Sequence, residues 1–101
     1  MHSKFLRLVA FALKANCPTK HVSLSNDFDG HAVTICNIID NEPFGPNIGV
    51  VTIKNEMVIL EANVVRNFLI YRYCDLNFGD LKAVLEGFSI VINNIPDGRG
   101  W

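Results

Sequence analysis

The chain has 101 residues, half of them hydrophobic, which suffices for one domain with a buried core and leaves little length for a second. Its net charge of −1 gives no overall support to non-specific binding of nucleic acid phosphates. The charge is unevenly distributed, because residues 1–26 carry four bases (Lys4, Arg7, Lys14 and Lys20) and no acid. We therefore expect a basic N-terminal segment on an acidic body.

The first predicted element is an amphipathic helix that Ser3 caps and that ends at Asn16, before Pro18. Apolar residues recur in it at spacings of three and four, which predicts a stripe that faces the core. The stripe consists of Phe5, Leu8, Val9, Ala12 and Leu13.

The opposite side of this helix carries Lys4, Arg7, Phe11 and Lys14, which are candidate partner-binding residues. One interpretation of this basic face is that it docks on an acidic partner or on a membrane surface. The alternative is an outer face that contacts only solvent, because such a face has the same pattern. The segment also has the basic, acid-free character of a mitochondrial presequence. No apolar run approaches the roughly 18 residues that a membrane-spanning helix needs.

The three cysteines, Cys17, Cys36 and Cys74, form no CxxC pair. Their odd number and wide spacing favour buried thiols in a reducing, cytoplasmic compartment over a disulfide framework. We expect no cofactor.

Two strands follow, over residues 21–25 and 32–39, and the sequence NDFDG lies between them. Asp27, Asp29 and His31 alternate there, so two carboxylates and one imidazole are a candidate metal site. A turn explains the same residues, since Asp and Gly supply its backbone freedom. We favour the turn and keep the metal site as an alternative.

Residues 40–49 contain two prolines and two glycines, which predicts a loop. By position it is a candidate functional loop, with Phe44 as a partner-binding residue.

A hairpin is predicted next over residues 50–65, with its turn at Lys54 and Asn55 or at Asn55 and Glu56. The strand that follows, residues 66–73, is apolar on both sides, which favours a homodimer or an obligate partner. Tyr71 and Tyr73 are its candidate partner-binding residues. They flank an arginine, a pattern that also suits stacking on single-stranded nucleic acid, although strand packing explains it more simply.

A short helix that Asp80 caps is predicted near the C-terminus, and the sequence FSIVINN then favours a final strand. Residues 1–95 are expected to form a single domain and residues 96–101 a flexible tail.

The predicted fold is α+β: an N-terminal helix packed on an antiparallel sheet of about five strands, with a short helix before the last strand. We find no catalytic constellation in the sequence, which favours a non-enzymatic protein-interaction module such as an inhibitor, an immunity-type protein or a viral or microbial accessory protein. One alternative is a metal-dependent small enzyme or binder at Asp27, Asp29 and His31. The other is a membrane-surface or nucleic-acid binder that uses the basic helix.

Overall fold

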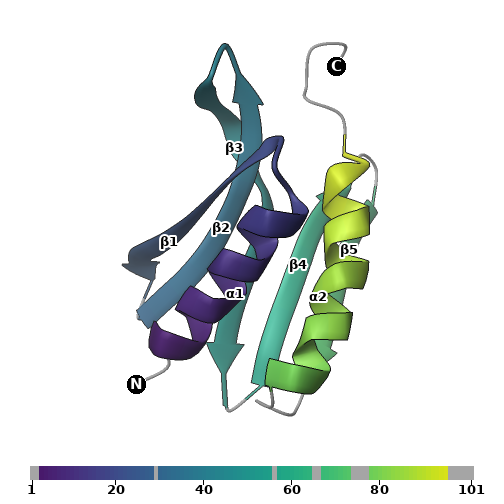
Figure 1. The fold of residues 1–101 in the computed structure, drawn as a ribbon. Coiled ribbons are helices and arrows are strands. Elements are labelled where there is room, and N and C mark those ends of the chain that lie inside the picture. Colours follow the sequence, from purple (N-terminus) through teal and green to yellow (C-terminus); the bar gives the residue numbers. More distant parts are fainter. Residues whose placement is uncertain (1–2, 29, 56, 65–66, 74–77, 96–101) are drawn as a thin grey trace.

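In the computed structural model, a helix is followed by five strands and a second helix (Figure 1). The structure describes the backbone of residues 3–28, 30–55, 57–64, 67–73 and 78–95, and the side chains of residues 4–25, 32–55, 57–63 and 81–95. The elements are α1 (Ser3–Asn16), β1 (Lys20–Phe28), β2 (Gly30–Ile39), β3 (Glu42–Lys54), β4 (Met57–Val64), β5 (Asn67–Tyr73) and α2 (Phe78–Asn93).

The five strands form one antiparallel sheet in which each strand pairs with the next along the chain. The pairing of Lys54 with Met57 leaves two residues at the β3–β4 turn, where Asn55 has a φ of 53°. Asparagine tolerates this left-handed conformation better than most residues. The predicted hairpin with Asn55 and Glu56 at its tip is confirmed.

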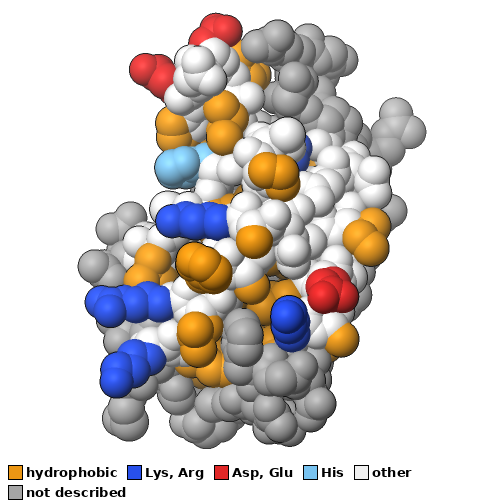
Figure 2. Space-filling view, in the orientation of Figure 1, with side chains coloured by type: hydrophobic (Ala, Val, Ile, Leu, Met, Phe, Trp, Pro, Cys, Tyr) orange, Lys and Arg blue, Asp and Glu red, His pale blue; other side chains and the backbone are white. Residues whose placement is uncertain are grey.

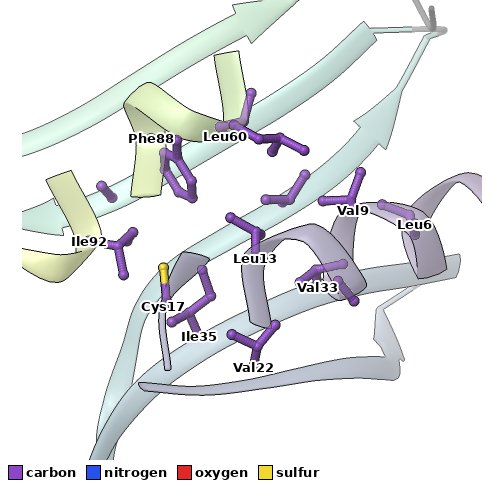
Figure 3. Packing of buried hydrophobic residues seen from close by; sticks show 14 of the residues in the cluster. Leu6, Val9, Leu13, Cys17, Val22, Val33, Ile35, Leu60, Phe88 and Ile92 are labelled. Atoms are coloured by element: carbon purple, nitrogen blue, oxygen red, sulfur yellow. The ribbon is translucent and has the colours of Figure 1, made fainter. Parts of the chain in front are cut away.

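Both helices lie side by side on the same face of the sheet (Figure 1). α1 contacts β1 and β2, α2 contacts β4, and the helices contact each other. Their inner sides and the sheet enclose one apolar core (Figure 3). It includes Leu6, Val9, Leu13, Cys17, Val22, Val33, Ile35, Val51, Val58, Leu60, Leu81, Leu85, Phe88 and Ile92.

The buried stripe of α1 differs from the predicted one. Leu6 and Ala10 are buried together with Val9 and Leu13, whereas Leu8 is 50% exposed, so its predicted place in the core is wrong. Nearly every residue from position 5 to position 13 is apolar, and hydrophobicity therefore did not fix the rotation of the helix about its axis.

α2 continues through the segment predicted to be the last strand, and that prediction is wrong. Leu85, Phe88 and Ile92 keep the helical spacing and are buried against the sheet. The Ser89 hydroxyl donates to the Leu85 carbonyl at 2.7 Å, so this polar side chain is satisfied inside the helix. Burial of the apolar stripe thus outweighs the β-propensity of the isoleucines and valine in this segment.

The predicted loop over residues 40–49 is also wrong. Only Asp40 and Asn41 form the turn, with φ values of 55° and 66°, and β3 begins at Glu42. Positive φ at both central residues is the geometry of a tight hairpin turn. The breaker residues lie within β3, where Gly45 has a φ of 79° and the register with β2 shifts.

Within the part of the chain that the structure describes, no helix is long and apolar enough to cross a membrane. The predicted tail, residues 96–101, lies outside the described residues.

Candidate interaction surfaces

The outward side of α1 combines positive charge with exposed apolar side chains. We call it the basic helix face and define it as Lys4, Arg7, Leu8, Phe11 and Lys14, all of which are exposed. Phe11 is 76% exposed, which is the largest exposure of any described large hydrophobic residue. In Figure 2, Lys and Arg side chains run along the α1 side of this view, with hydrophobic side chains between them.

The geometry of a helix explains why these residues share one face. Lys4, Arg7, Phe11 and Lys14 follow one another at spacings of three, four and three, so they align along the axis over about 15 Å. No acid occurs before Asp27 in the sequence, and therefore no acidic side chain of α1 offsets the three positive charges. The predicted exposure of these four residues is confirmed.

A second exposed feature is the hairpin of residues 38–47, which we call the hairpin arm. Its residues 40–47 are all exposed, and in the described part of β3 pairing with β4 begins only at Gly49. Figure 1 shows the arm continuing past the end of α1. Asp40 and Glu42 make the arm acidic, and Phe44 is 51% exposed beside them.

The face of the sheet opposite the helices carries mostly neutral side chains at its centre, with the half-buried Glu61 of β4 paired to Val50. Alternation along the strands places Thr34, Val50, Thr52 and Ile59 there, all of them half-buried. Ser23 and Thr34 share a hydrogen bond of 3.0 Å across β1 and β2 on this face. Within the described residues, neither helix contacts this face, and it is therefore a third surface that a partner can reach.

A polar cluster near the C-terminal ends of both helices has a structural role. The Lys20 ammonium donates to Asn37 Oδ1 at 2.8 Å and to the Ile95 carbonyl oxygen at 2.7 Å. The Asn93 amide donates to the carbonyl oxygen of Asn16 at 2.9 Å, which links the ends of α1 and α2. A positive charge at the C-terminal end of a helix stabilises the carbonyl groups there.

Cys17 belongs to the same region but lacks the properties of a nucleophile. It is 1% exposed, and burial raises the pKa of its thiol. A side-chain hydrogen bond with Ser89 and the charge of Lys20 lower this pKa, but by less than burial raises it. The thiolate is the reactive form of cysteine, so a buried thiol with a raised pKa is unreactive. Cys17 and Cys36 are both free and buried, as the sequence predicts, and Cys74 lies outside the described residues.

The candidate metal residues lie at the β1–β2 connection. Asp27 is in β1 and His31 in β2, while Asp29 and the side chains of all three lie outside the described part. Phe28 pairs with Gly30, so the segment is a strand-to-strand connection, as predicted. Among the side chains that the structure describes, no three metal-binding groups come together.

The structure places only the backbone of the two tyrosine candidates. Tyr71 pairs with Leu60 and Tyr73 with Val58, and both tyrosine side chains lie outside the described residues. Their predicted role in partner binding stays a prediction.

Sequence reasoning missed three residues of these surfaces, Leu8, Asp40 and Glu42. Leu8 was assigned to the core, yet it borders Phe11 on the basic helix face. Asp40 and Glu42 had no assigned role, because a flexible loop would not have held them next to Phe44. The two adjacent residues that favour positive φ, Asp40 and Asn41, are the signal of the tight turn.

No protein-family model, curated protein or solved structure matches the chain.

Proposed function

We propose that this chain is a non-enzymatic protein-interaction module that binds an acidic segment of a partner protein through the basic helix face. The observation that carries the proposal is Phe11, which is 76% exposed between Arg7 and Lys14 on a helix without acids. An exposed aromatic side chain supplies the apolar contact that dominates many interfaces. Surrounding charges of one sign steer a partner of the opposite sign and select its orientation.

The chemistry of α1 favours a protein over a lipid surface. A helix that lies in a membrane interface buries a continuous apolar side in the lipid. In α1 that side is already buried in the core, through Leu6, Val9 and Leu13, and among the described side chains of this helix Leu8 and Phe11 are the only exposed large apolar ones. The net charge of −1 likewise provides no long-range attraction to nucleic acid.

Two matched double variants test the proposal. Lys4→Glu with Lys14→Glu reverses two exposed lysines on the basic helix face, and Lys54→Glu with Lys82→Glu reverses two exposed lysines elsewhere. Proteins captured from a source lysate by the wild-type chain are identified, purified and titrated against all three forms. We expect the α1 double variant to weaken binding roughly tenfold or more at low salt, and the control variant to bind like wild type.

A third variant, Phe11→Ser, removes the aromatic contact and keeps the charge. It should weaken binding of the same partner even at high salt, since apolar contact is not screened. Phosphatidylserine vesicles and a single-stranded oligonucleotide serve as competing ligands. Equal loss of binding in both lysine double variants, or tight binding of vesicles or oligonucleotide in place of any protein, would overturn the proposal.

A further inference from the structure

The hairpin arm has the chemistry that the basic helix face requires of a partner. Asp40 and Glu42 are exposed acids, and Phe44 lies next to them on a strand that projects from the body. The sequence contains no Lys or Arg between Lys20 and Lys54, so the arm itself contributes acids and neither of these two bases. The chain therefore carries an acidic, aromatic segment and a basic, aromatic surface.

The two surfaces are separated within one molecule. The arm continues past the C-terminal end of α1, whereas the basic helix face extends along that helix from Lys4 to Lys14 (Figure 1). In Figure 2 acidic side chains gather at the arm end of the view, and the Lys and Arg side chains of the α1 side lie away from that end. A contact between the two surfaces thus requires two molecules.

We infer that the hairpin arm of one copy docks on the basic helix face of a second copy. The inference rests on the proposed function, because it names a segment of this chain as one acidic partner of that face. Charges of opposite sign meet, with Asp40 and Glu42 against Arg7 and Lys14, and the rings of Phe44 and Phe11 supply the apolar contact.

The geometry of the contact predicts the type of oligomer and the strength of the association. The contact joins two different surfaces. It yields a closed pair when both copies exchange arms about a two-fold axis, and otherwise a ring or an open chain of molecules. Exposed charge pairs contribute little each and are screened by salt. The association should therefore be weak and salt-sensitive, and it occupies the face that an acidic partner would use.

A charge-swap experiment tests the inference. The helix variant is Lys4→Glu with Lys14→Glu, and the arm variant is Asp40→Asn with Glu42→Lys, where asparagine keeps the positive φ at position 40. Sedimentation velocity is measured from micromolar to millimolar concentration at low and high salt. We expect wild type to self-associate at low salt, and each variant alone to associate roughly tenfold more weakly or worse.

The decisive sample is an equimolar mixture of the two variants. The mixture should regain association, because the reversed arm now faces a reversed helix and the two unchanged surfaces remain complementary. The Lys54→Glu, Lys82→Glu variant should associate like wild type. Circular dichroism checks that every variant is folded, and Glu42→Gln alone replaces the arm variant if that one unfolds.

The inference is overturned if wild type stays monomeric at millimolar concentration. It is also overturned if association survives both variants, which would assign self-association to another surface such as the open sheet face. Failure of the proposed function is a separate result, since it is measured on a different captured protein. If the wild-type chain stays monomeric and the helix variant no longer binds the captured protein, the proposed function is supported and the second-copy inference is wrong.

Discussion

The two helices pack side by side on one sheet face, yet their outward sides differ. The outward side of α1 has three bases, no acid and two exposed apolar residues. On α2, Lys82 and Glu86 are four residues apart and offset each other, and Ile90 is an isolated exposed apolar residue. Similar inner sides therefore serve the fold in both helices, while only the outer side of α1 has the charge and aromatic content of a binding surface.

The largest expected effect is a difference in the free energy of unfolding between substitutions on the inner and the outer side of α1. Leu13 is 0% exposed and Leu8 is 50% exposed on the same helix. Leu13→Ala should lower the free energy of unfolding by about 2–5 kcal/mol, because it opens a cavity between α1 and the sheet. Leu8→Ala should cost less than about 1 kcal/mol. Urea unfolding measures both, and similar losses for the two variants would mean that the inner and outer sides of α1 are not separable.

The contrast between the helices also explains what the sequence predicted. For α1, the cap, the spacing and Pro18 agreed, and the helix lies where it was expected. For α2, the run of β-branched residues at Ile90, Val91 and Ile92 favoured a strand. The segment is helical because the helix buries Phe88 and Ile92 against the sheet. The helical spacing of Leu85, Phe88 and Ile92 is present in the sequence, but burial against the sheet, which decides between the two signals, is tertiary information.

The candidate surfaces were predictable to a different extent. Lys4, Arg7, Phe11 and Lys14 were identified because helical spacing alone puts them on one face. The part of the hairpin arm that belongs to β3 was not identified as a strand, since Pro43, Gly45 and Pro46 are residue types that normally end strands. The register shift between Ile35 and Asn37 accommodates these residues, and such a bulge depends on the partner strand.

A second prediction tests how α2 docks on the sheet. A Cβ atom added to Gly49 would lie 2.7 Å from Cδ1 of Ile92 and 3.2 Å from Cδ1 of Ile35. Both side chains are buried, so Gly49→Ala should lower the free energy of unfolding by about 1–2 kcal/mol despite the entropy gained from replacing glycine.

Gly87 provides the matched control, because it is exposed in α2 and an added Cβ meets nothing within 4 Å. Gly87→Ala should raise the free energy of unfolding by about 0.5–1 kcal/mol, since alanine favours the helix. The two substitutions thus have opposite expected signs in the same thermal or urea titration. A stabilising Gly49→Ala would show that α2 does not press on β3 at this point.

The last expected effect is seen only above pH 9 and concerns the contact between the ends of the helices, where Cys17 of the α1 end meets Ser89 of α2. Burial raises the pKa of the Cys17 thiol above its ordinary value of 9.0. The protonated thiol is therefore favoured in the folded state, and its contribution to stability is fully present below pH 9.

As the pH rises above 9, the unfolded chain loses this proton before the folded chain does, and the free energy of unfolding falls by at most about 1.4 kcal/mol per pH unit for one proton. Cys17→Ala should have a shallower decline above pH 9 than wild type, because the variant lacks the thiol proton that wild type loses on unfolding. Parallel declines in urea titrations across this range would place the Cys17 sulfur in contact with water, and the α1 end would then not be closed against α2.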